Sequence, residues 1–240
     1  MLIAWSGLAV ALAADPPLGR GQTLEQISDA LRMADGHPNE KHRLYALRSY
    51  LKQDFAAAAE QFELAAGFAD KYSQHRLSLM YWDGEGVRRD RALAYVWSDL
   101  AAERGTPKLL TIREKMWAQL GQDEQARVAA LGADYYARFG DAVAKPRQIA
   151  RMRRFALQRT GSRVGWDGNR LDISVPRSGQ IGQVDQSQPL SAESLYGPER
   201  TQPKLYWRIQ DAILAGGTVE VGSPDSVAPG PDPETAPKSP

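Results

Sequence analysis

The chain contains no cysteine among its 240 residues. This absence excludes disulfide bonds, thiol catalysis, zinc sites built on thiolates and lipid attachment at a cysteine. An excess of charge is missing as well, because 30 basic and 29 acidic residues leave a formal net charge of +1. The overall charge therefore predicts no general attraction to nucleic acid or to acidic partners.

Familiar catalytic and nucleotide-binding motifs are also missing from the sequence. No G-x-S-x-G turn, phosphate-binding loop, H-E-x-x-H segment or dinucleotide-binding glycine pattern occurs. The three histidines, His37, His42 and His75, lack the spacing and acidic neighbours of a metal site, so we interpret them as surface or capping residues. Asp83 and Glu85 lie together in a glycine loop, where a turn explains them better than acid–base work. We predict a protein that is not an enzyme and holds no metal or cofactor.

The N-terminal residues 1–14 are apolar and end in Ala11-Leu12-Ala13, a small-x-small cleavage pattern. This pattern predicts a secretory signal peptide, which is too short to span a bilayer. The sequence therefore indicates export to a bacterial periplasm or secretion. No basic residue precedes the apolar run, and a buried N-terminal helix is the alternative.

Residues 74–105 carry the clearest structural pattern of the chain. Residues 77–82 are apolar, and the DGEG sequence at 83–86 then ends the predicted helix, because glycine permits a turn with positive φ. Asp90 suits the N-cap of a second helix, and Gly105 suits its C-terminal end. The apolar face of this second helix follows the spacing i, i+3, i+4, i+7 and i+11, through Leu93, Val96, Trp97, Leu100 and Arg104.

A copy of this pattern lies 36 residues upstream, where an aspartate and four alanines have the same residue types. The matching pairs are Asp54 and Asp90, Ala56 and Ala92, Ala58 and Ala94, Ala65 and Ala101, and Ala66 and Ala102. A helix pair this short cannot bury both of its faces alone, so the copy predicts stacked repeats. The second unit has the longer inter-helix loop, because Tyr81 precedes Asp90 by nine positions and Tyr50 precedes Asp54 by four.

The second unit also carries a set of residue types at fixed positions: Leu77, Ser78, Met80, Tyr81, Gly84, Gly86, Val87, Asp90, Ala94, Trp97, Ala101, Ala102 and Gly105. With them, residues 41–106 resemble the Sel-one-like repeat family, a relative of the tetratricopeptide repeats. Gln74 and Ser78 depart from the family pattern, which prefers alanine and glycine there. The upstream unit is more similar to a tetratricopeptide repeat proper. The resemblance implies an α-solenoid whose inner surface binds other proteins, and it supplies no catalytic residues.

The predicted fold class is therefore all-α, with an α-solenoid of helix pairs within residues 22–140. A first helix begins after the candidate capping box of Thr23 and Gln26. Two further helices, at residues 108–120 and 124–139, form a third or capping pair.

The C-terminal part changes in character after Gly140. We expect a basic helix over residues 141–160, an irregular extension with short strands over 161–222, and a disordered proline-rich tail over 223–240. The strand candidates are residues 171–175, 204–209 and 218–221, with Tyr206 and Trp207 as anchors of the second.

Two groups of residues are candidate binding sites. The first is aromatic, because aromatic side chains dominate the energetics of protein interfaces; it consists of Tyr81, Trp82, Tyr95 and Trp97. At helical spacing in a solenoid, the alternative is that most of them belong to the core. The second is a basic stretch from Lys145 to Arg163, and its candidate anion-binding residues are Arg147, Arg151, Arg153, Arg154 and Arg159.

The basic stretch suits anionic lipid head groups, an anionic cell-wall polymer or an acidic protein face. The alternative is a solvated helix face whose charges pair with acids elsewhere in the fold. Taken together, the sequence predicts a non-catalytic interaction module of the cell envelope that binds another protein or peptide through its repeat groove. An envelope binder of anionic lipid or polymer is the second hypothesis, and a hydrolase is a third. Nucleic acid is not an expected partner of an exported protein.

Overall fold

The structure is a computed structural model, and it describes residues 24–158 and 196–215. The predicted signal peptide at residues 1–14, the strand candidates at 171–175 and 218–221 and the proline-rich tail at 223–240 lie outside these described residues.

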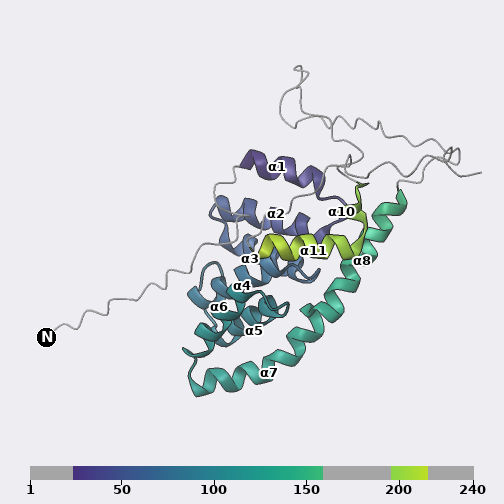
Figure 1. The fold of residues 1–240 in the computed structure, drawn as a ribbon. Helices are drawn as coiled ribbons and strands as arrows, with labels where there is room; N and C mark the ends of the chain where they lie inside the picture. Colours follow the sequence, from purple (N-terminus) through teal and green to yellow (C-terminus); the bar gives the residue numbers. More distant parts are fainter. Residues whose placement is uncertain (1–23, 159–195, 216–240) are drawn as a thin grey trace, which may run out of the picture.

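All regular elements in the described ranges are helices, which confirms the all-α prediction for this part of the chain. They are α1 (Leu24–Met33), α2 (Pro38–Leu51), α3 (Phe55–Ala66), α4 (Lys71–Asp83), α5 (Arg91–Ala102), α6 (Pro107–Trp117), α7 (Gln122–Phe139), α8 (Asp141–Gln158), α10 (Pro198–Thr201) and α11 (Pro203–Leu214). The helices α1 to α6 pack in sequence order, each against its neighbour in the series. Helix α7 packs back on α5. In Figure 1, α7 and α8 follow one another along one side of the molecule.

The predicted helix pairs correspond to α2–α3 and α4–α5. Asp54 and Asp90, which the 36-residue offset relates, are both N-caps: their carboxylates accept hydrogen bonds from the amides of Ala57 at 3.2 Å and Leu93 at 3.1 Å. Of the four related alanine pairs, three are buried in both copies. These pairs are Ala58 and Ala94, Ala65 and Ala101, and Ala66 and Ala102. Small side chains at these positions let neighbouring helices approach closely.

The DGEG loop joins the second helix pair to the first. Gly84 ends α4 in the left-handed conformation, as predicted. Gly86 also has a positive φ of 71°, and a Cβ atom there would lie 2.4 Å from the backbone carbon of Phe55. Glu85 accepts a hydrogen bond from the Tyr50 hydroxyl at 2.8 Å. The loop is therefore a packing element between the pairs, which agrees with a turn role for Glu85.

The main core lies between these helix pairs and α7. Its largest fully buried side chains include Trp97, Phe62, Leu77 and Met80. The ring of Trp97 contacts Tyr135 and Phe139 of α7, with centroid distances of 5.3 and 4.7 Å. Gln74, one of the residues that departs from the repeat pattern, donates a hydrogen bond to the Phe139 carbonyl at 3.0 Å. Its amide therefore joins α4 to the end of α7.

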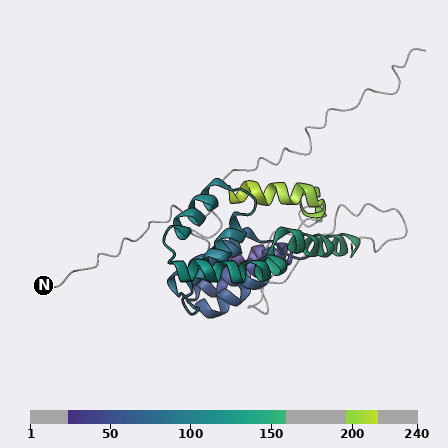
Figure 2. The same cartoon turned by 90° about the horizontal axis from the view of Figure 1, so that it is seen from below.

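The prediction of a strand at residues 204–209 is wrong, because these residues belong to α11. Pro203 stands in the first turn of this helix, where its missing amide costs no hydrogen bond. Tyr206, Trp207 and Leu214 fall on one helical face and are buried. The segment that suggested a strand covers only six residues, which is too short to separate a helical period from a strand period. Figure 2 shows α11 lying to one side of the other helices and not among them.

Within residues 24–158 and 196–215, no helix is both long enough and apolar enough to cross a membrane.

Candidate functional site

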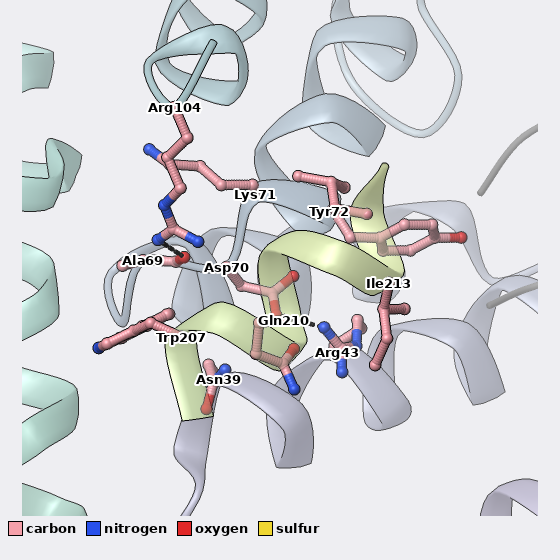
Figure 3. A pocket seen from close by; sticks show the side chains of 11 residues that line it. Asn39, Arg43, Ala69, Asp70, Lys71, Tyr72, Arg104, Trp207, Gln210 and Ile213 are labelled. Atoms are coloured by element: carbon pink, nitrogen blue, oxygen red, sulfur yellow. Dashed lines mark hydrogen bonds and ion pairs between the residues drawn. The ribbon is translucent and has the colours of Figure 1, made fainter. Parts of the chain in front are cut away.

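The most distinctive site of the structure lies where α11 meets the helix pairs. Side chains of α11 form hydrogen bonds with Asn39 and Glu40 of α2 and with Arg104, which follows α5. We call these three residues the α11 surface. Asn39 is 167 positions away from its partner Tyr206, and Arg104 is 107 positions away from its partner Asp211. Figure 3 shows Asn39 and Arg104 among the residues that line the cavity beside α11, together with Trp207 and Gln210 of that helix.

At one end of the site, Glu40 is the centre of the contacts. Its carboxylate accepts hydrogen bonds from Tyr206 at 3.0 Å and Gln210 at 3.3 Å, and it forms an ion pair with Arg200 at 3.1 Å. Burial alone would raise the pKa of Glu40, but Arg200, His37 and Arg43 lower it. Glu40 is therefore an ionised acceptor that holds α10 and α11 together on α2.

His37 belongs to the same end of the site. Its Nε2 atom lies 2.9 Å from the Arg200 carbonyl, and its Nδ1 atom lies 3.0 Å from the Arg200 guanidinium. Burial lowers the pKa of His37, which favours the neutral ring that can donate from Nε2 and accept at Nδ1. His37 occupies the N-cap position of α2, in agreement with the interpretation as a capping residue, although it is buried and its side chain makes no capping hydrogen bond. The interpretation as a surface or capping residue is wrong for His75, which is buried within α4.

At the other end, Arg104 connects three segments of the chain. Its guanidinium forms ion pairs with Asp141 of α8 at 2.7 Å and with Asp211 of α11 at 2.8 Å, and it donates to the Ala69 carbonyl at 2.8 Å. The ring of Trp207 lies beneath it, 4.6 Å from the guanidinium carbon. Burial alone would raise the pKa of Asp141, but hydrogen bonding from Arg104 and the charge of Lys71 hold it well below its usual range.

Lys71 is the remaining buried cation of this network. Burial lowers the pKa of Lys71, and a lysine with a lowered pKa is a candidate catalytic group. However, its ammonium donates hydrogen bonds to the Leu100 carbonyl at 2.8 Å, to Glu103 at 2.7 Å and to the Gln74 side-chain oxygen at 3.1 Å. It also forms an ion pair with Asp141 at 3.0 Å. Because the three acceptors occupy its three donors, Lys71 has a structural role.

The space left beneath α11 is small. The cavity lined by Arg43, Asp70, Lys71 and Trp207 has a volume of about 20 Å³, and Arg43 and Asp70 form an ion pair across it at 2.6 Å. Such a volume holds about one water molecule. The cavity therefore has no room for an organic substrate while α11 is in place.

The four aromatic residues that were predicted to bind a partner do not lie together on one surface. Trp97 is 1% exposed and belongs to the core. Tyr95 packs on Trp117 of α6 at a centroid distance of 4.8 Å, and Trp82 lies beneath Arg91 at 4.3 Å. Tyr81 is half-buried against the core. Of these four residues, Tyr81, Trp82 and Tyr95 are the ones that remain partly exposed.

The basic stretch divides into parts with different surroundings. Lys145 forms an ion pair with Asp141 at 2.9 Å. Arg147 donates to the carbonyls of Arg138 and Gly67 at 2.7 and 3.2 Å. Arg151, Arg153 and Arg154 are exposed on α8, while Arg159 and Arg163 lie outside the described residues. Lys145 is paired with an acid on its own helix, and within the described residues Arg151, Arg153 and Arg154 form no ion pair.

No metal centre was found among the described residues, since none of their His, Asp and Glu side chains form a group of three that could hold an ion. Sequence reasoning missed Glu40, Arg104 and Asp211 as members of a site. The signals that were available are Tyr206 and Trp207, an aromatic pair in an otherwise polar region. Their role as anchors was expected, but on a strand.

Searches against protein-family models, curated proteins and solved structures found no match to this chain. The resemblance to Sel-one-like repeats therefore rests on the residue pattern of 41–106 and remains a prediction.

Proposed function

We propose that the protein is a non-catalytic interaction module, an α-solenoid of tetratricopeptide-like and Sel-one-like helix pairs that binds a helical segment of a partner protein on the α11 surface. The observation that carries this proposal is α11 itself. A helix far away in the sequence lies on the helix pairs, and the charged side chains of Glu40 and Arg104 hold two neighbouring rows of its side chains. The same surface can accept a partner helix when α11 leaves.

The contacts define the kind of helix that this surface accepts. Tyr206 and Gln210 meet Glu40, and Trp207 and Asp211 meet Arg104. Each of these two pairs has the spacing i, i+4, which places its members on one helical face. A suitable partner helix therefore presents two adjacent aromatic residues, followed one turn later by a polar and an acidic residue.

The chemistry of the surface favours exchange over permanent closure. Ion pairs that are buried on folding gain little net free energy, because the loss of hydration offsets much of their attraction. The α11 contacts include one partly buried pair, between Arg104 and Asp211, and hydrogen bonds to the charged Glu40, whereas the helix pairs pack mainly through apolar side chains. A partner helix that reproduces the contacts can therefore compete with α11.

The proposal is tested with a fluorescent peptide of residues 197–215 and the full-length chain. The variant Trp207→Ala with Asp211→Asn weakens the internal α11 at one end of the site. We expect the peptide to bind this variant at least about tenfold more tightly than the wild type, because a covalently linked helix competes at a high effective concentration. Fluorescence anisotropy measures the binding.

Lys204→Ala with Arg208→Ala is the matched control, because both residues are on the exposed face of α11. This variant should behave like the wild type. If the Trp207→Ala, Asp211→Asn chain keeps its helical circular dichroism and does not bind the peptide, the helix-binding proposal fails. Equal binding to all three proteins would mean that the peptide binds elsewhere, which also contradicts the proposal.

The proposal also assigns the module to the bacterial cell envelope, on the signal-peptide pattern of residues 1–14. Expression in a Gram-negative host followed by mass spectrometry of the periplasmic fraction tests this assignment. We expect a mature chain that begins at Asp15. A protein that keeps residues 1–14 and stays in the cytoplasmic fraction would contradict it.

A further inference from the structure

A second cavity lies away from the α11 surface, between the turn after α1 and the outer part of α8. Its volume is about 490 Å³, and it is open to solvent on one side. Volumes of this size are typical of pockets for small organic ligands. Its lining includes Lys41, His42, Phe68, Arg151, Arg154 and Phe155.

The charge of this cleft is unbalanced. Lys41 forms an ion pair with Asp35 at 3.0 Å, and Asp35 is the acidic residue in the lining. Arg151 and Arg154 form no ion pair within the described part of the chain, in contrast to Arg43, Arg104 and Arg200. The two are three positions apart on α8, where like charges repel. An anion bound between them would relieve this repulsion.

The floor of the cleft is apolar and fixed in position. The ring of Phe155 packs against Gly36 so closely that a Cβ atom at Gly36 would lie 2.3 Å from it, and it stacks on Tyr196 at a centroid distance of 4.9 Å. Phe68 and His42 lie parallel at the other side, with ring centroids 6.5 Å apart. His42 is oriented by a contact of 2.9 Å between Nδ1 and the Gln61 side-chain oxygen. Aromatic side chains and two guanidinium groups that form no ion pair within the described residues line the same cleft, which suits a ligand with a ring and an acidic group.

We propose that this cleft binds a small organic anion that carries a phosphate or carboxylate group on an apolar ring. The guanidinium groups of Arg151 and Arg154 bind the acidic group, since arginine presents paired donors that match these planar or tetrahedral anions. The ring of the ligand packs between Phe155 and Phe68. This site does not rest on the helix-binding function, because it shares no residue with the α11 surface.

The test uses isothermal titration calorimetry on the full-length protein with phenyl phosphate as the probe. We expect saturable binding that weakens as salt is added, because charge attraction is screened. Arg151→Gln and Arg154→Gln should each reduce the affinity about tenfold or more, in proportion to the loss of a charge-assisted hydrogen bond. Arg153→Gln is the matched control, since Arg153 is exposed on the same helix outside the lining, and it should leave the affinity within about twofold.

Three further probes separate the proposal from its alternatives. Inorganic phosphate should bind more weakly than phenyl phosphate, and equal binding would indicate an adventitious ion only and overturn the proposal. Benzyl alcohol should not bind detectably, and binding equal to that of phenyl phosphate would show that charge has no part. Retention on anionic phospholipid vesicles that phenyl phosphate does not compete away would assign the two arginines to a membrane surface and overturn the small-ligand site. A loss of affinity in Arg153→Gln equal to that in the other variants would also contradict it.

Discussion

The helix pairs and the α11 surface differ in their balance of apolar and polar contacts, although two of the three residues of the α11 surface lie in α2. Between the pairs, alanines and large apolar side chains such as Phe62 and Trp97 form most of the contacts, supplemented by polar contacts such as that of Tyr50 with Glu85. Beneath α11, Glu40 and Arg104 bind polar side chains of the helix, next to a small apolar cluster around Tyr206 and Trp207. The free energy gained by burying apolar side chains scales with the buried area and does not depend on direction, whereas ion pairs require particular partners. The pairs are therefore the stable part of the fold, and the α11 surface is the selective part.

This difference also explains why the two regions tolerate different changes. A cavity in the apolar core cannot be filled by water at low cost, so it is destabilising in proportion to its volume. A charged contact can be replaced by water if its partners become exposed. Substitutions in the pairs should therefore lower the free energy of unfolding of the whole protein, while substitutions beneath α11 should respond to pH.

The largest effect is expected for Trp97→Ala. Trp97 is 1% exposed and contacts Tyr135 and Phe139, so its removal leaves a large apolar cavity. We expect the free energy of unfolding to fall by about 3–5 kcal/mol, measured by urea denaturation and circular dichroism.

Trp117→Ala is the control for this prediction, because Trp117 is 37% exposed and packs on Tyr95 near the surface. Its cost should be clearly smaller. If Trp97→Ala unfolds at the same urea concentration as the wild type, Trp97 is not a core residue. The prediction that it binds a partner then becomes the better interpretation.

An intermediate effect is expected at Asp141, and it depends on pH. In the folded chain the pKa of Asp141 lies well below its ordinary value, because hydrogen bonding from Arg104 and the charge of Lys71 outweigh the effect of burial. Ionised Asp141 therefore stabilises the fold above about pH 4, and this contribution is lost as the pH falls through the folded pKa. Asp141→Asn should lose on the order of 2 kcal/mol at pH 7 and should show a flatter decline of stability between about pH 4 and pH 2.

Asp134→Asn provides the comparison, because Asp134 is exposed on the neighbouring helix α7. The Asp134→Asn substitution changes the net charge by the same amount as Asp141→Asn, but it leaves the ion pairs of Asp141 with Arg104 and Lys71 intact. Urea denaturation at a series of pH values measures both variants. Parallel pH profiles for the two variants would show that the network has no special part in acid stability.

The difference between the helix pairs and the α11 surface also determines how much of the structure can be predicted from the sequence. Asp54, Asp90 and Gly84 act through amides and turns close to them in the chain, so their roles as caps could be identified from local pattern. The alanine pairs were visible because the pattern repeats. Within these segments, the predicted helices agree with α2 to α7 to within a few residues.

The candidate site could not be predicted in the same way. Glu40 and Arg104 are ordinary charged residues in the sequence, and they become a site only because α11 brings Tyr206 and Asp211 to them. Helical periodicity carries no information about such distant pairing. The error over residues 204–209 has the same origin, because a short apolar run without its partner fits either a helix or a strand. The basic stretch was found as a cluster, but which of its residues form ion pairs depends on the position of α8.

The smallest expected effect compares two buried glutamines of the same exposure. Gln74 and Gln148 are both 0% exposed, but Gln74 donates to the Phe139 carbonyl, whereas neither polar atom of the Gln148 side chain has a hydrogen-bond partner within the described residues. Gln148 shares one face of α8 with Ala144 and Met152, which pack with Tyr206 and Trp207.

Gln148→Met should therefore raise the free energy of unfolding by about 1 kcal/mol, because it removes unpaired polar atoms from an apolar contact, while Gln74→Met should lower it. Urea midpoints at an unchanged denaturant slope measure both changes. A loss of stability in both variants would mean that the contact between α8 and α11 requires the amide of Gln148, which would extend the polar character of the α11 surface into its apolar side.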